Sequence, residues 1–380
     1  MRTIDESTGG QGDAATSEDR AGTGPRRTAA PRSTAARSTA PRSTAAGATA
    51  TRGTATSEAG RSAPAPRSGR AGRAARAGMP MLHLSAPSPS GGLPGARPSV
   101  PAQASTGVAD LLRGPLRQGT VLLSAPSALY VTVPTPSGPE VVGVLTSDAA
   151  RLPLGCILFR TSNGRPLVSA PSGTPATVGG GRLVVGDLTV SAAAWWDPRP
   201  KLPTARPALL PEGVRELRAA LYGEGVPHST FVLPGLAGGP SGPLAALRGA
   251  VRRADLDAAL RTATRLIGEG PGLTPVGDDV LAGTTAGLVL LGHPAAERFG
   301  SGVTGLAAGR TTELSRALLR HAAAGRVTGE YAAVLRAMVG DGPLVPAIRA
   351  LLGGGSTSGR ALALGLCTAI DLVERTSRPR

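Results

Sequence analysis

The 380-residue chain has little lysine, few aromatic residues, two cysteines and no long apolar run. Lys201 is its only lysine, so arginine carries nearly all the positive charge. The three Phe, three Tyr and two Trp residues are too few for the stacking platforms that bind single-stranded nucleic acid, and we expect no nucleic-acid partner. Cys156 and Cys367 lie far apart, which favours a reducing cytoplasm over a disulfide framework. The best apolar candidate, 280–291, is shorter than the roughly 18 residues of a membrane span, so we predict a soluble protein.

Residues 1–80 consist almost entirely of Ala, Arg, Ser, Thr, Gly and Pro. Arg-Ser-Thr recurs every five residues from Arg32, a spacing that fits neither a helix nor a strand, so we expect a disordered tail. The tail has no apolar core for a secretory signal, and its acidic residues argue against a transit peptide. Two alternatives remain open: an arginine-rich functional arm, or untranslated upstream sequence with the true start at Met79 or Met81.

The rest of the chain divides into a Pro-rich linker at 81–104, a β-rich region at 105–200 and a helical region at 201–375. Short β-branched runs separated by Pro, Gly and Asn predict strands at 131–133, 140–145, 155–159 and 182–190. Helical patterns predict helices at 214–222, 243–251, 254–267, 312–324, 330–339, 346–352 and 360–373. The apolar run at 280–291 is predicted to be a buried helix that begins near Asp278. The expected fold class is α+β, with a small antiparallel β-rich domain followed by an all-helical half.

The segment GPGLTPVGDD, residues 270–279, is the strongest candidate for chemistry. Its glycines allow a ligand to approach the backbone closely, and the helix that follows offers N–H groups to an anion. We predict Asp278 and Asp279 as catalytic, because carboxylates at a helix start can hold a cation or a substrate amide. Simple capping of the helix is the alternative. The predicted ligand-binding residues of this loop are Gly270, Gly272, Leu273, Thr274 and Gly277.

A second Gly-rich loop, GGGSTSG at 353–359, also opens onto a helix. We predict that it converges with the first loop on one small anionic ligand, although a flexible helix linker would have the same composition. Its predicted binding residues are Ser356, Thr357, Ser358 and Gly359. Thr312 and Ser315 begin a further helix and are added to the candidate set, with capping by Thr312 as the alternative.

The four histidines show no metal-ligand spacing and no triad with a nucleophile. His321 falls on an apolar helix face and is predicted to be a core residue, while His293 follows a helix end. We therefore expect no metal and no cofactor. The alternative is a Mg²⁺ ion held by Asp278 and Asp279 through oxygen ligands.

Three segments taken together, GPGLTPVGDDVLAG, TTELSRALLRHAAAG and GSTSGRALALGL, resemble a domain-of-unknown-function family in their order and spacing. The family includes AllH, a subunit of the bacterial oxamate carbamoyltransferase of allantoin degradation. The resemblance extends over about 105–375 and includes the Trp-Asp-Pro at Trp196. It implies partner subunits, one similar to acyl-CoA synthetases and one similar to AllG. It also implies exchange of oxalurate and phosphate for oxamate and carbamoyl phosphate.

Two positions depart from the family pattern. Val276 stands where the family usually has Ser, and Ser356 stands where it commonly has His. Either change would alter activity or substrate if the replaced side chain takes part in the chemistry. Two functions follow from the sequence: a carbamoyl- or acyl-transferring subunit that binds a small carboxylate or phosphate ester, or a non-catalytic assembly or regulatory subunit.

Overall fold

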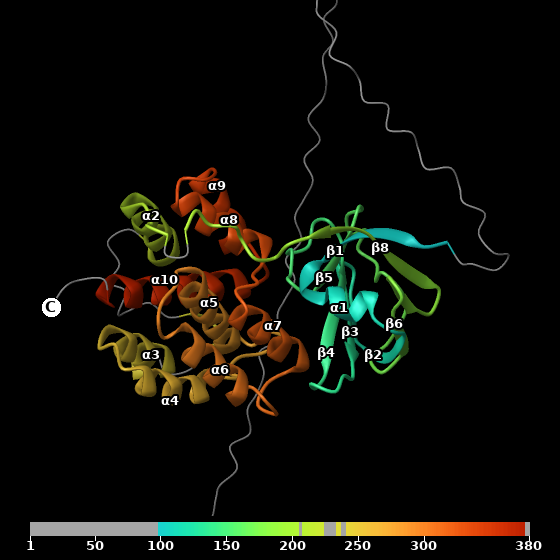
Figure 1. Ribbon diagram of the computed structural model, residues 1–380, viewed down its shortest axis with the longest axis horizontal. Coiled ribbons are helices and arrows are strands. Elements are labelled where there is room, and N and C mark those ends of the chain that lie inside the picture. Colours follow the sequence, from blue (N-terminus) through green and yellow to red (C-terminus); the bar gives the residue numbers. More distant parts are fainter. Residues whose placement is uncertain (1–97, 205–206, 224–232, 237–240, 377–380) are drawn as a thin grey trace, which may run out of the picture. The chain divides into compact units, whose positions relative to one another are not determined.

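The computed structural model describes residues 98–204, 207–223, 233–236 and 241–376. The predicted tail at 1–80 and most of the predicted linker lie outside these residues. Within them a β-barrel at 100–196 is followed by helices (Figure 1). No helix in this part of the chain is long and apolar enough to cross a membrane.

Eight strands close the barrel in the order β1-β5-β4-β3-β2-β6-β7-β8. Their bounds are β1 Val100–Ser105, β2 Arg117–Ser124, β3 Ala128–Val133, β4 Glu140–Leu145, β5 Gly155–Leu158, β6 Pro175–Gly179, β7 Arg182–Val185 and β8 Leu188–Trp196. A short 3-10 helix, Thr106–Val108, and α1, Ala109–Arg113, follow β1. The barrel core consists mainly of Val, Leu and Ala side chains. β3 and β4 are buried at almost every position, so both of their faces are covered.

The predicted antiparallel β domain is wrong in topology. The barrel is mixed, because β1 pairs in parallel with β8 and β4 pairs in parallel with β5. The closing strand is β1, which lies between β5 and β8 although its sequence, VPAQAS, falls in the predicted linker. Pro101 and the small residues around it hid the strand from a search for β-branched runs, and without that strand the barrel has an open edge.

The helical region surrounds one buried helix. α5, Val276–Leu290, is buried over almost its whole length and packs against α10, Ser358–Thr376. The other helices lie around this pair in Figure 1. They are α2 Pro211–Tyr222, α3 Pro243–Arg252, α4 Leu256–Leu266, α6 Ala296–Leu306, α7 Glu313–Ala323, α8 Gly329–Met338 and α9 Leu344–Leu352.

α5 and α10 approach closely because glycines stand where they cross. A Cβ on Gly283 would lie 2.3 Å from the carbonyl oxygen of Leu362, and one on Gly365 would lie 2.3 Å from that of Val280. Tyr331 on α8, fully buried, donates a hydrogen bond from its hydroxyl to the carbonyl of Gly283 at 2.7 Å. These contacts fix the start of α5, where the predicted site lies.

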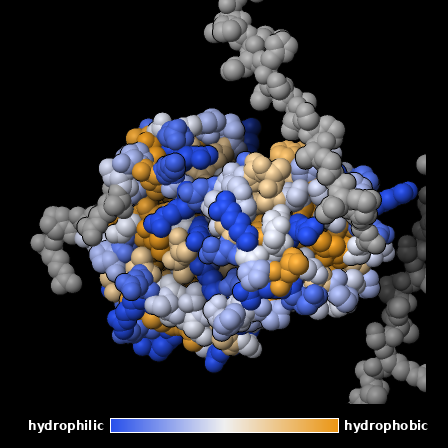
Figure 2. All heavy atoms as spheres, turned by 45° about the vertical axis from the view of Figure 1, so that its right-hand side comes forward, coloured by the Kyte–Doolittle hydropathy of each residue, from blue (hydrophilic) through white to orange (hydrophobic). Residues whose placement is uncertain are grey.

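The barrel and the helices also meet directly. Leu314 and Ala317 of α7 belong to the buried cluster of the barrel core. Arg320 of α7 donates to the carbonyl of Pro139 at 2.8 Å and pairs with Glu140 at 3.2 Å. On the face drawn in Figure 2, hydrophilic and hydrophobic side chains are interspersed.

Candidate functional site

The two Gly-rich loops meet at one cavity of about 190 Å³. Thr274 and Asp279 from the first loop and Ser358 and Gly359 from the second line it. Thr274 Oγ1 and Ser358 Oγ are 3.2 Å apart and form a hydrogen bond between the loops. The structure therefore brings these four predicted residues together, and their binding of a ligand stays a prediction.

Asp279 is a buried carboxyl group in the cavity wall. Its side chain is 5% exposed, and its Oδ2 atom has no hydrogen-bond partner among the described residues. Burial raises the pKa of this carboxyl to about 7; a hydrogen bond from Ser358 opposes the rise, and repulsion from Asp278 adds to it. A buried acceptor without a partner is rare in proteins and is therefore a candidate contact for a ligand.

Asp278 is also buried, but its side chain holds neighbouring loops together and does not face the cavity. Its Oδ1 accepts a hydrogen bond from the backbone N–H of Gly268 at 2.9 Å, and its Oδ2 accepts one from the Thr311 hydroxyl. Burial raises the pKa of Asp278, while these two contacts oppose the rise. The side chain thus ties the loop after α4 and the loop before α7 to the start of α5. It does not line the cavity.

Other predicted site residues also serve the packing of the loops. The Thr312 hydroxyl accepts from the N–H of Ser315 at 3.0 Å, which confirms capping of α7, and donates to the carbonyl of Leu273 at 2.5 Å. Leu273 packs against the barrel core. The first turn of α5 is also occupied, since the N–H of Gly277 donates to the carbonyl of Glu269 at 2.9 Å. The predicted residues that do not line the cavity are Gly270, Gly272, Leu273, Gly277, Asp278, Thr312, Ser315, Ser356 and Thr357.

Val276 and Ser356, the two positions expected from the sequence to depart from the family pattern, lie outside the cavity wall. Val276 is 1% exposed and belongs to the helical core. Ser356 is exposed in the second loop. Neither side chain lines the cavity in this chain.

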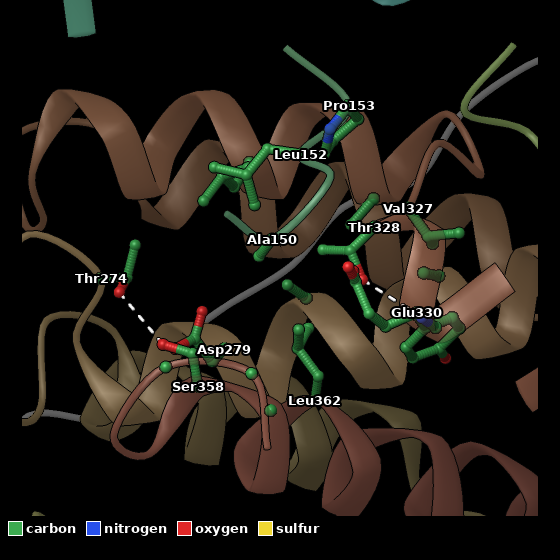
Figure 3. Close-up of a pocket in the computed structure, with 18 of the residues that line it drawn as sticks. Ala150, Leu152, Pro153, Thr274, Asp279, Val327, Thr328, Glu330, Ser358 and Leu362 are labelled. Carbon is green, nitrogen blue, oxygen red and sulfur yellow. Dashed lines mark hydrogen bonds between the residues drawn. The ribbon is translucent and has the colours of Figure 1, made fainter. Parts of the chain in front are cut away.

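The residues at the opposite end of the cavity were not predicted from the sequence. Arg326 and Thr328 line it from the segment between α7 and α8, and Glu330 lines it from the first turn of α8. Leu152 and Pro153 line it from the loop between β4 and β5. Figure 3 shows Asp279, Ser358 and Thr274 at one end, and Thr328 and Glu330 at the other. The available signal was the segment GRVTGE, in which an arginine and an acid flank a short loop between two predicted helices.

The rest of the wall is mainly apolar, with Ala282, Ala286, Leu318 and Leu362 among its residues. An apolar cavity of about 150 Å³ holds one benzene molecule. The volume here therefore suits a small ligand with polar groups at its two ends. No group of three or more His, Cys, Asp or Glu residues in the described ranges is arranged to hold a metal ion.

A barrel joined to helices, with a buried carboxyl oxygen (Asp279 Oδ2) that has no partner among the described residues in a small cavity between the two parts, is typical of a protein that binds a small polar molecule. Residues 266–370 match the family described as oxamate carbamoyltransferase subunit AllH. The resemblance predicted from the three motifs is thereby confirmed for this part of the chain, which includes every helical residue of the cavity wall. Comparison with curated proteins and with solved structures gave no match.

Proposed function

We propose that this chain is a subunit of a carbamoyl-transferring complex and that the cavity binds its small amide-bearing substrate. The observation that carries the proposal is Asp279, a 5% exposed carboxylate whose Oδ2 has no partner among the described residues. A carbamoyl or amide NH₂ group donates the hydrogen bonds that such an oxygen accepts. The family match supports a subunit of oxamate carbamoyltransferase and therefore the presence of partner subunits.

The end of the cavity lined by Arg326 and Thr328 suits the anionic group of such a substrate. Arg326 forms no ion pair within the described part of the chain, and it lines the cavity together with Thr328. A guanidinium recognises a carboxylate or a phosphate group. Oxamate, oxalurate and carbamoyl phosphate each carry an amide at one end and an anionic group at the other. In this assignment Asp279 binds and orients the amide, and Arg326 binds the anion.

Binding of these three compounds to the purified chain, alone and with an acyl-CoA-synthetase-like partner, tests the proposal. Calorimetry at pH 8, where Asp279 is ionised, should show that Asp279→Asn weakens binding at least about tenfold, because a charge-assisted hydrogen bond contributes roughly 1.5–3 kcal/mol. Asp257→Asn is the matched control, since Asp257 is an exposed carboxylate on α4. Absence of binding to the wild-type chain in both settings, or equal weakening by the two variants, would contradict the proposal.

The non-catalytic alternative has one specific observation in its favour. Gly277, Asp278 and Thr312 all make contacts that hold the loops together, as a purely structural motif would. It predicts that Asp279→Asn changes stability but not ligand binding. The same calorimetric titration therefore separates the two functions.

A further inference from the structure

A second cavity, of about 420 Å³, lies between α1, the β3–β4 connection and α7. Three arginines line it: Arg117 from β2, Arg320 from α7 and Arg326 from the segment after α7. Two acids, Asp110 and Glu140, line it as well. Cations therefore outnumber anions three to two, which favours an anionic ligand.

Two of these guanidiniums have unused capacity. Arg320 is occupied by Glu140 and by the carbonyl of Pro139. Arg117 and Arg326 form no ion pair within the described residues. A guanidinium presents five N–H donors in a planar fork, and an oxyanion satisfies them two at a time.

A buried imidazole adds a second observation. His321 lines the same cavity, is 5% exposed, and its Nδ1 has no hydrogen-bond partner among the described residues. Burial, with smaller contributions from Arg326 and Arg320, lowers the pKa of His321 to about 3, so the ring is neutral at physiological pH. A neutral imidazole with its proton on Nδ1 is a donor, and buried donors are normally paired.

Hydroxyl groups complete the wall. Thr135 and Ser137 line the cavity from the β3–β4 connection, and their hydroxyl oxygens are 3.0 Å apart. Guanidiniums, an imidazole and hydroxyls around one space form the donor set that proteins use for tetrahedral oxyanions.

We propose that this second cavity binds a phosphoryl group, either free phosphate or the phosphoryl end of a small phosphate ester, through Arg117, Arg326 and His321. The site is separate from the Asp279 cavity, and Arg326 lines both cavities. A ligand in one cavity therefore affects the position or the availability of the Arg326 guanidinium for a ligand in the other. The proposal shares Arg326 with the proposed function, but its other observations, on Arg117, His321 and the two hydroxyls, involve neither Asp279 nor the Gly-rich loops.

Calorimetric titration of the full chain with inorganic phosphate and, separately, with methyl phosphate tests this site. We expect Arg117→Gln to weaken the binding of the preferred ligand at least about tenfold, in line with the loss of one charge-assisted contact. Arg182→Gln is the matched control, because Arg182 is an exposed strand arginine of the same barrel that lines neither cavity. Preference for phosphate identifies a site for the free ion, and preference for methyl phosphate identifies an ester site.

Three results would overturn the proposal. The first is no binding of either ligand by the wild-type chain at millimolar concentration. The second is equal weakening by Arg117→Gln and Arg182→Gln, which indicates nonspecific charge. The third is weakening by Arg326→Gln and Asp279→Asn but not by Arg117→Gln, which places the anion in the Asp279 cavity. His321→Gln, measured together with its melting temperature, checks the imidazole: a folded variant with unchanged phosphate affinity removes His321 from the site.

Discussion

The two Gly-rich helix starts have the same backbone design and different side chains. At the start of α5, a Cβ on Gly277 would lie 2.0 Å from the carbonyl oxygen of Leu266, at the end of α4. At the start of α10, a Cβ on Gly359 would lie 1.9 Å from that of Leu351, near the end of α9. Each glycine thus lets a helix begin against the helix before it in the chain. These two glycines therefore serve helix packing, while Asp279 and Ser358, close to them in the chain, line the cavity.

Gly277→Ala should give the largest effect. The added methyl group meets a backbone carbonyl that no side-chain rotation can move aside, so we expect a loss of more than about 4 kcal/mol in the free energy of unfolding, enough to prevent folding. Expression level and thermal unfolding measure it. Gly359→Ala should behave in the same way if the two starts share one design.

Gly305→Ala is the matched control for both glycines. Gly305 is an exposed residue within α6, and a Cβ there meets nothing within 4 Å. The free energy of unfolding should rise by about 0.5–1 kcal/mol, the cost of glycine in a helix. A folded Gly277→Ala protein with near-normal stability would show that this glycine serves the ligand instead of the packing.

Asp279→Asn should give the next largest effect, at most about 4 kcal/mol. The folded carboxyl keeps its proton up to about pH 7, while an unfolded one releases it near 3.8. The folded state therefore binds more protons between these values, and the free energy of unfolding of the wild type falls as pH rises from about 4 to about 7. Asparagine has no such proton, so the variant should match the wild type near pH 4 and exceed it at pH 8.

Asp278→Asn tests the other half of this comparison. It removes an acceptor from the contacts with Gly268 and Thr311, so we expect it to lower the free energy of unfolding at pH 8 by about 1–2 kcal/mol. Urea denaturation at several pH values measures both variants. The same sign of change for the two at pH 8 would contradict the division of roles between the adjacent carboxylates.

The different roles of these carboxylates show how far the sequence can predict the site. Adjacent residues of a helix point about 100° apart, so Asp278 faces the loops and Asp279 faces the cavity. Their common position at a helix start could be predicted, but which one faces the cavity depends on the packing of α5 against α10. Arg326 and Glu330 escaped prediction for the same reason, because only tertiary packing brings them to the cavity.

Helices were more predictable than strands for physical reasons. α4 has apolar residues at regular three-to-four spacing and was predicted within two residues of each end. α6 was missed because Gly300, Gly302 and Gly305 weaken both its apolar pattern and its helix propensity. Strand pairing depends on contacts far apart in the chain, so neither β1 nor the parallel pairs could be read from local patterns.

The smallest expected effect is a change in ligand affinity caused by a substitution at the start of α10. Ser358 donates toward Asp279 and bonds with Thr274, whereas Ser356, two residues earlier, is exposed. Ser358→Ala should therefore weaken binding of a carbamoyl ligand about fivefold, the value of one neutral hydrogen bond, while Ser356→Ala leaves the affinity unchanged. The same calorimetric titration measures both. A larger effect of Ser356→Ala would place the functional part of this loop at Ser356, outside the cavity wall. Equal, negligible effects would leave the first helix start as the sole source of polar contacts at this end of the cavity.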